Sequence, residues 1–213
     1  VPTHEYKEGF IYNLDTRNGY NGTDCFYTPY DVEVSIGAGE TRNFYVVCST
    51  SPEDVNGFDV LKDMLDRKRG LGNNLPAKDG LLDRLVYSAD NFIVARNSTG
   101  FKSVLAGFPW FLDWGRDTMI AFTGLTLCTH RFDDARSILI SFAKYIKDGL
   151  LPNVFPDTSE DQPYYNTMDA SMWYFYAVYK YLQYDKSPEA AEFIRNDIYP
   201  VLEQIIDNYK KGT

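Results

Sequence analysis

Basic residues are scarce in this sequence relative to acidic ones, with 21 lysines and arginines against 30 aspartates and glutamates and a net charge of −9. Nucleic acids and anionic membrane surfaces bind proteins through clusters of Lys and Arg, so this charge argues against both as partners. No apolar run reaches the roughly 18 residues that a membrane-spanning helix needs. The sequence therefore predicts neither a nucleic-acid-binding protein nor a membrane protein.

Cysteine and histidine, which often bind metals, are also sparse. The three cysteines are scattered, and the two histidines, His4 and His130, lie far apart, so neither residue type has the spacing of a metal site. An odd, small number of cysteines is typical of a reducing compartment, and we expect a cytoplasmic protein. A glycine-rich phosphate loop and a Gly-x-Ser-x-Gly motif are absent as well. The sequence predicts no metal and no cofactor, and no motif defines an oligomeric state.

Aromatic residues, in contrast, are abundant, with 17 Tyr, 14 Phe and 3 Trp making up 16% of the 213 residues. Rings that also carry a polar group suit flat, half-polar ligands such as sugars, although Tyr and Trp are also common in cores. The hydrophobic fraction of 44% is enough for a sizeable core. The length fits one large domain, or one domain and part of another.

The first part of the chain, residues 1–52, has the pattern of β-strands. We expect strands in 9–15 and 26–50, and residues 31–36 alternate polar and apolar side chains, which is the period of a half-buried strand. The sequence GAGE at 37–40 predicts a turn, and 42–49 then forms the return strand. These strands are too few to stand alone, so we expect them to be the last antiparallel strands of a β domain that continues before Val1.

From residue 53 onward the pattern is helical. The segments 118–128 and 170–182 are apolar on nearly all sides, which predicts complete burial, whereas 79–96 and 133–149 are amphipathic. Alternation of buried and amphipathic helices is typical of two concentric rings, and we expect residues 53–213 to be the N-terminal half of an α/α barrel. A plain α-solenoid is the alternative, but no fixed-period repeat is found. The predicted helices are 53–70, 79–96, 118–128, 133–149, 170–182 and 187–211, the last with a kink at Pro200, and a turn at 97–100 precedes a short extended piece.

Charged residues gather among aromatic rings in AGFPWFLDWGRDTMIAF, residues 106–122. This stretch contains Asp113, Arg116 and Asp117, interleaved with Trp110 and Trp114, directly before a helix predicted to be buried. Because a folding core has no need of three charges at this place, we interpret the stretch as part of a binding site.

A second candidate group precedes the next helix of the buried type. Tyr165 and Asn166 come shortly before Asp169, which opens the helix, and the long proline-containing segment 149–166 leads into it. If both buried helices point the same way, their N-termini share one end of the barrel. Asp113, Arg116, Asp117 and Asp169 should then all converge on one mouth of the barrel.

Glycoside hydrolysis fits these residue types, because it needs two carboxyl groups, one to protonate the leaving oxygen and one to activate water or attack. Arg and Asp can bind sugar hydroxyls, and Trp and Tyr can stack on a pyranose ring. Asp is also a favoured N-cap residue, so Asp117 and Asp169 could instead only cap helices in a non-catalytic carbohydrate-binding or scaffold protein. A helix N-terminus lowers a carboxyl pKa, whereas a general acid needs its pKa raised.

The stretches WGRDT and YNTMDASMW, in this order, resemble the glucosidase domain of glycogen debranching enzymes, the amylo-α-1,6-glucosidase of the bacterial and archaeal type. The resemblance covers roughly residues 80–212, and residues 1–50 more weakly resemble the end of that family's N-terminal β-sandwich domain. It implies an (α/α)6 barrel that removes single glucose residues, left as α-1,6-linked stubs, from a branched α-glucan such as glycogen.

The resemblance also implies roles for individual residues. Related glucoamylase barrels carry a W-x-R-D motif whose Arg and Asp hold the terminal glucose, which assigns glucose binding to Arg116 and Asp117. The acidic residue that opens the later inner helix is the general acid in an inverting reaction, which is Asp169 here. The general base is a glutamate from the C-terminal part of the barrel, beyond Thr213, so we expect this chain alone to be inactive. Another glycosidase of this architecture, glucoamylase-like or trehalase-like, is the alternative. The predicted substrate-binding residues are Trp110, Asp113, Trp114, Arg116, Asp117, Tyr165 and Asn166.

Overall fold

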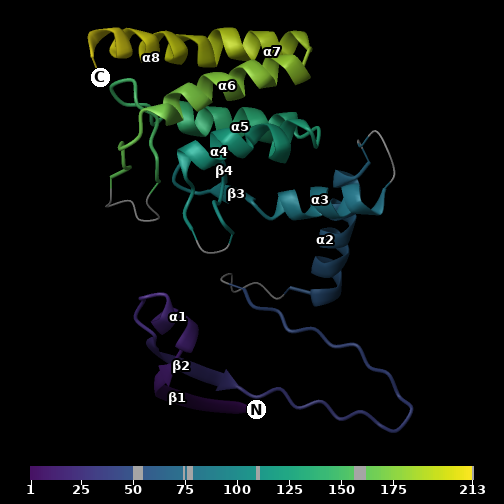
Figure 1. The fold of residues 1–213 in the computed structure, drawn as a ribbon. Coiled ribbons are helices and arrows are strands. Elements are labelled where there is room, and N and C mark those ends of the chain that lie inside the picture. The colour runs from purple at the N-terminus through teal and green to yellow at the C-terminus, as the bar shows by residue number, and fades with distance from the viewer. Residues whose placement is uncertain (50–54, 74, 76–78, 109–110, 156–161, 213) are drawn as a thin grey trace. The chain divides into compact units, whose positions relative to one another are not determined.

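The computed structural model describes residues 1–49, 55–73, 75, 79–108, 111–155 and 162–212. The chain forms two compact units, Val1–Phe58 and Asp59–Thr213, and each is described by itself (Figure 1). The described residues are mainly helical, with two small antiparallel sheets of two strands each. The mainly α fold class expected from the sequence is therefore confirmed, whereas the barrel and the assignment of residues 1–52 and 53–213 to two domains stay predictions.

The first unit contains a β-hairpin, in which β1 (Pro2–Ile11) pairs antiparallel with β2 (Thr23–Tyr30) around a short helix, α1 (Asn13–Arg17). The strand predicted at 9–15 therefore ends at Ile11, and its last residues are helical.

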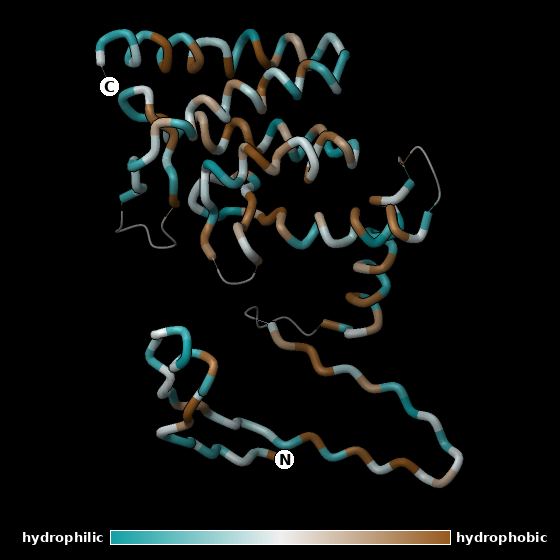
Figure 2. The backbone as a smooth tube through the Cα atoms, viewed as in Figure 1, coloured by the Kyte–Doolittle hydropathy of each residue, from teal (hydrophilic) through white to brown (hydrophobic). Residues whose placement is uncertain are grey.

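The strands predicted at 31–36 and 42–49 are not formed in the structure, although the turn between them is, with the Glu40 N–H donating to the Gly37 carbonyl (3.1 Å). Figure 2 shows hydrophobic and hydrophilic residues alternating along this segment, as a strand requires. The apolar side chains nevertheless stay exposed, for example Val34 (41%) and Phe44 (57%). An alternating pattern makes a strand only where a neighbouring strand pairs with it and a core covers its apolar face.

The second unit holds helices that correspond to all six predicted ones. It has one sheet, in which β3 (Ile93–Arg96) pairs antiparallel with β4 (Phe101–Val104). The helical elements are α2 (Gly57–Leu71, which begins at the end of the first unit), α3 (Gly80–Asp90), α4 (Gly115–Phe122), the π-helix η1 (Thr123–Leu127), α5 (Phe132–Ala143), α6 (Asp169–Tyr184), α7 (Pro188–Phe193), the π-helix η2 (Ile194–Ile198) and α8 (Tyr199–Lys211).

Two predicted helices are shorter than expected. The helix predicted over 79–96 ends at Asp90, because the residues after it pair across the predicted 97–100 turn with β4, where Ile93 is opposite Val104. The helix predicted over 133–149 ends at Ala143, and Gly149 follows with a left-handed backbone (φ +80°) at a place where an added Cβ would lie 2.7 Å from Asn208 Cβ. Tertiary pairing overrides the local helical period in both cases.

The C-terminal helix is interrupted where a kink was predicted. Ser187 caps its start, since its Oγ accepts a hydrogen bond from the Ala190 N–H (3.1 Å) and Pro188 occupies the first helical position. The π-helical turn η2 ends at Ile198, two residues before Pro200. Proline has no N–H to donate to the preceding turn, and a wider π turn is one way in which a helix accommodates such a gap.

The core of the second unit lies between α4, α5 and α6, with α7, η2 and α8 packed on it (Figure 1). Its largest fully buried side chains include Phe122, Phe142, Phe155, Tyr174 and Tyr181. None of the helices in the described parts of the chain is long and apolar enough to cross a membrane.

The expectation that α4 and α6 are buried on all sides is wrong. Ile120 on α4 is 48% exposed, and on α6 the exposed fractions are 45% for Met172, 42% for Tyr176 and 56% for Tyr179. The sequence period therefore predicted the apolar character of these helices but not the exposure of these side chains.

A polar cluster ties α5 to both ends of the α6–α7 connection. Arg136 on α5 donates from Nε to the Tyr181 hydroxyl (2.5 Å) and from Nη2 to Asp185 Oδ2 (2.9 Å). Asp185 also accepts from the Tyr181 hydroxyl (2.9 Å) and from the Ser187 N–H (3.0 Å). Burial alone would raise the pKa of Asp185, but these donors outweigh it and lower the pKa to about 2.

This cluster predicts a pH dependence of stability. Because the pKa of Asp185 is lower in the folded chain than the value near 3.9 of an unfolded one, its stabilising effect is complete above about pH 4 and is lost as the pH falls towards 2. Replacing Asp185 with Asn removes the ionisation. In urea unfolding, the free-energy difference between wild type and D185N should shrink by an amount on the order of 2 kcal/mol between pH 5 and pH 2. A difference that stays constant over this range would contradict the prediction.

Candidate functional site

The two charged motifs lie at the N-termini of α4 and α6. Trp114 occupies the N-cap of α4, so Arg116 and Asp117 lie within its first turn, and Met168 occupies the N-cap of α6, so Asp169 is its first residue. Neither aspartate is therefore in the N-cap position, which corrects the expectation on which the capping alternative depended. Asp169 is close enough to the N-terminus of α6 for the partial positive charge there to stabilise its ionised form.

Arg116 and Asp169 contact each other directly across the two helices. The Arg116 Nε and Nη2 atoms both donate to Asp169 Oδ1, at 3.0 and 2.7 Å. The two side chains remain 42% and 51% exposed. The structure thus brings these two predicted residues together, as the shared end of two neighbouring helices implies. An ion pair that is this open to water is held weakly and can exchange partners.

Arg116 lowers the pKa of Asp169. Its hydrogen bond is the largest effect on the pKa of Asp169 and lowers it, and donation from Trp173 acts in the same direction, against a smaller rise from burial. Asp169 is therefore ionised at neutral pH in the free protein.

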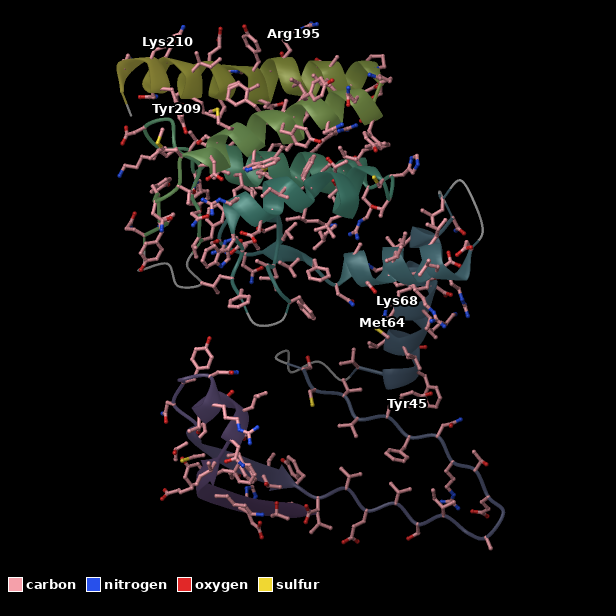
Figure 3. The ribbon with its side chains drawn as sticks, viewed as in Figure 1. Tyr45, Met64, Lys68, Arg195, Tyr209 and Lys210 are labelled. Carbon is pink, nitrogen blue, oxygen red and sulfur yellow. The ribbon has the colours of Figure 1, made fainter. Side chains whose placement is uncertain are left out.

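A buried contact and an exposed contact hold the start of α6 in place. Ser171 is fully buried, and its hydroxyl donates to the Gly149 carbonyl (2.9 Å) and accepts from the Leu151 N–H (2.8 Å). The hydroxyl of Tyr209, labelled on α8 in Figure 3, donates to the carbonyl of Met168 (2.6 Å). The residue before Asp169 is thus fixed by α8, and the second residue after it by the 149–151 segment.

Backbone pairing places the aromatic residues of the two motifs near each other. Trp114 forms an antiparallel bridge with Val154, which forms a second bridge with Tyr164. The next residue, Tyr165, is partly buried, and its hydroxyl donates to the Tyr145 carbonyl (2.6 Å). Asn166 is exposed, and Trp110 lies outside the described residues.

Asp117 lines a hollow whose lining does not include Arg116 or Asp169. This hollow has a volume of about 390 Å³ and is otherwise apolar, with Asp117 as its one acidic residue among the described ones. It is lined by Phe92, Val104, Leu105, Ala106, Gly107, Asp117, Ile120, Ala121 and Leu125.

Asp113 is not at the surface. It is 1% exposed, and its carboxylate accepts hydrogen bonds from Arg96 Nη1 (2.6 Å) and from the Ser103 hydroxyl (2.7 Å). Burial raises the pKa of Asp113, and Ser103 and Arg96 oppose this rise only in part. The sequence placed Asp113 with the sugar-facing residues because its neighbours are aromatic, and it gave no sign of this buried partner.

Sequence reasoning missed several residues that shape this region, namely Arg96, Ser103, Ser171 and Tyr209. Arg96 was assigned to a helix, whereas it ends β3. Ser171 lies within YNTMDASMW but was given no role, and Ser103 and Tyr209 belong to no motif. Each of these residues acts through a contact with a distant segment of the chain. A local sequence pattern does not show such a contact. Among the described residues, no group of three or more His, Cys, Asp or Glu side chains could hold a metal ion.

A helical unit in which an arginine and a carboxylate meet at the ends of two neighbouring helices, beside partly exposed rings, fits the helical glycoside hydrolases as a class. Comparison of the sequence with known families gives the particular one. Residues 87–213, more than half of the chain, match the family described as amylo-alpha-1,6-glucosidase, and the chain belongs to this family.

The chain is also similar in sequence to a curated protein. The chain is 40% identical over 85 residues to the glycogen debranching enzyme of Saccharomyces cerevisiae. The matched part is 38% of this chain but only 5% of that enzyme, so the chain spans a small part of the relative's length.

Proposed function

We propose that this chain contributes the glucose-binding residues and the general acid of an enzyme that hydrolyses α-1,6-linked glucose stubs on a branched α-glucan such as glycogen. The observation that carries the proposal is the contact between Arg116 and Asp169, which joins the two motifs that resemble the family. Membership of the amylo-alpha-1,6-glucosidase family supports the reaction class.

In the proposed mechanism, Asp169 protonates the glycosidic oxygen, and Arg116 and Asp117 bind hydroxyls of the terminal glucose. Trp114, Tyr165 and Asn166, with Trp110, complete the glucose-binding surface. An inverting enzyme also needs a second carboxyl roughly 6.5–9.5 Å away, with a water molecule between the two. We assign no described residue to this role and expect a glutamate from a later part of the barrel.

The ion pair explains how Asp169 can change from an ionised to a protonated group. In the free chain Arg116 lowers the pKa of Asp169, which is the wrong direction for a general acid. When glucose binds, its hydroxyls compete for the guanidinium, and the bound sugar excludes water from the carboxyl. Both changes raise the pKa of Asp169, so substrate binding itself prepares the acid.

The proposal includes a cytoplasmic location and branched glucan as the main partner. The three cysteines, Cys25, Cys48 and Cys128, are free and exposed, which supports a reducing compartment. The net charge of −9 supports a neutral polysaccharide over a nucleic acid or an anionic membrane.

Glucose release from a maltodextrin that carries single α-1,6-linked glucosyl stubs tests the proposal. A longer enzyme that includes this chain is expected to release glucose from the stubs, whereas the 213-residue chain alone is expected to release none. A linear maltodextrin and trehalose serve as control substrates, because a glucoamylase-like or trehalase-like enzyme would prefer one of them. Glucose from the purified chain would overturn the expectation that a second carboxyl is missing, and inactivity of the longer enzyme on stubs would overturn the substrate.

A further inference from the structure

We infer that Asp113 is a positioning residue, which fixes the segment carrying Trp114 and Arg116 from inside the protein and does not bind sugar. The inference rests on the proposed function, in which these two neighbours contact glucose.

The burial of Asp113 keeps it away from any ligand. Its side chain is 1% exposed, and each carboxylate oxygen already accepts a short hydrogen bond, Oδ1 from Arg96 and Oδ2 from Ser103. A sugar hydroxyl would have to displace a buried donor to reach either oxygen. Asp113 therefore has a structural role and does not bind the substrate.

The contacts of Asp113 and Arg96 connect three separate segments of the chain. Arg96 ends β3 and Ser103 lies on β4, so the carboxylate is held by both strands of one hairpin. The Asp113 carbonyl accepts from the N–H of Phe155 (3.2 Å), and the guanidinium of Arg96 lies over the Phe155 ring, 5.0 Å from its centre. The hairpin, the 113–116 segment and the 153–155 segment are thus tied together at one buried charge.

The position of Asp113 is transmitted to the site over a very short stretch of chain. Trp114, the next residue, pairs with Val154, and the Gly115 N–H donates to the Asn153 carbonyl (2.8 Å). Arg116 follows immediately and contacts Asp169. With only two residues, Trp114 and Gly115, between the buried anchor and Arg116, a shift of the anchor moves the glucose-binding groups.

The Asp113→Asn variant tests the inference, because asparagine keeps the shape and removes the charge that faces Arg96. Asp185→Asn is the matched control, since Asp185 is also buried (8% exposed) and paired with an arginine, Arg136, but lies at the far end of α6. Both variants are expected to have a lower Tm. Only D113N is expected to shift the NMR signals of the Trp114 indole N–H and the Arg116 Nε–H.

Affinity provides the second readout, with isomaltose, an α-1,6-linked glucose disaccharide, as the probe. D113N is expected to weaken isomaltose binding by about 10- to 100-fold, the range that corresponds to the loss of one hydrogen bond to a charged group. D185N should bind as wild type does. If D113N matches D185N in both the NMR signals and the affinity, the inference is wrong.

Two further outcomes remain decisive. If D113N does not fold, Ser103→Ala, which removes one of the two hydrogen bonds, should shift the same two signals by a smaller amount, and unchanged signals would overturn the inference. If the wild-type chain binds no isomaltose, the proposed function has failed for this chain. The NMR signals alone then decide whether Asp113 positions Trp114 and Arg116.

Discussion

Replacing Asp169 with asparagine, in a full-length glucosidase that contains this chain, is expected to lower kcat on α-1,6-linked glucose by about 10²- to 10⁴-fold. That range is the usual contribution of a positioned proton donor. Asparagine keeps the size of the side chain and can still accept a hydrogen bond from Arg116, so the contact between the two helices is expected to survive. What is lost is the proton for the leaving oxygen.

The choice of substrate separates the loss of an acid from general damage to the site. An α-glucosyl fluoride has a leaving group that needs little protonation, so D169N is expected to keep most of its activity on this substrate. Asp133→Asn is the control, because Asp133 lies in the first turn of α5 with its side chain 98% exposed. The activity of the D133N enzyme should equal that of wild type on both substrates. Equal losses on both substrates would assign Asp169 to binding or to stability, and a kcat within a few-fold of wild type would exclude it as the acid.

The location of Asp169 shows what local sequence can predict. The apolar runs after WGRD and after YNTM predicted two helices with charged residues at their starts, and α4 and α6 begin there. That these two starts lie side by side followed from the alternation of buried and amphipathic helices. The capping role did not follow, because the sequence does not place a helix boundary to within one residue. Met168 and Trp114 take the cap positions in the structure.

The β3–β4 hairpin that contains Arg96 could not be predicted from the local sequence pattern. Phe92 and Ile93 continue the apolar spacing of the preceding helix, so the period alone extends that helix through Arg96. The structure instead ends α3 at Asp90 and pairs β3 with β4, which places Arg96 against Asp113. Pairing the two strands and neutralising a buried carboxylate both stabilise the folded chain. This stabilisation comes from residues distant in sequence, so a local pattern does not show it. For the same reason the sequence grouped Asp113 with its exposed neighbours.

Gly115, in the W-G-R-D motif, lies where the main chain of this motif approaches the main chain at Pro152. A Cβ added to Gly115 would lie 2.1 Å from the Pro152 carbonyl oxygen, 3.2 Å from Leu151 Cδ2 and 3.3 Å from Phe142 Cε1. The first of these distances is far below van der Waals contact, and the atom concerned belongs to the main chain, which cannot rotate away. The glycine also donates its N–H to the Asn153 carbonyl (2.8 Å), so the two segments are both close and bonded.

Gly115→Ala is therefore expected to destabilise the chain by about 3 kcal/mol or more, at the upper end of the range for overpacked cores. The segment would have to move away from 152–153, which breaks the bond to Asn153 and carries Arg116 away from Asp169. Gly124→Ala is the matched control, because Gly124 is helical and exposed with no atom within 4 Å of the added Cβ. Its free energy of unfolding should stay within about 1 kcal/mol of wild type, on the stabilising side. Urea unfolding of the three proteins measures both effects, and equal changes in the two variants would show that the close approach at Gly115 is not what requires glycine there.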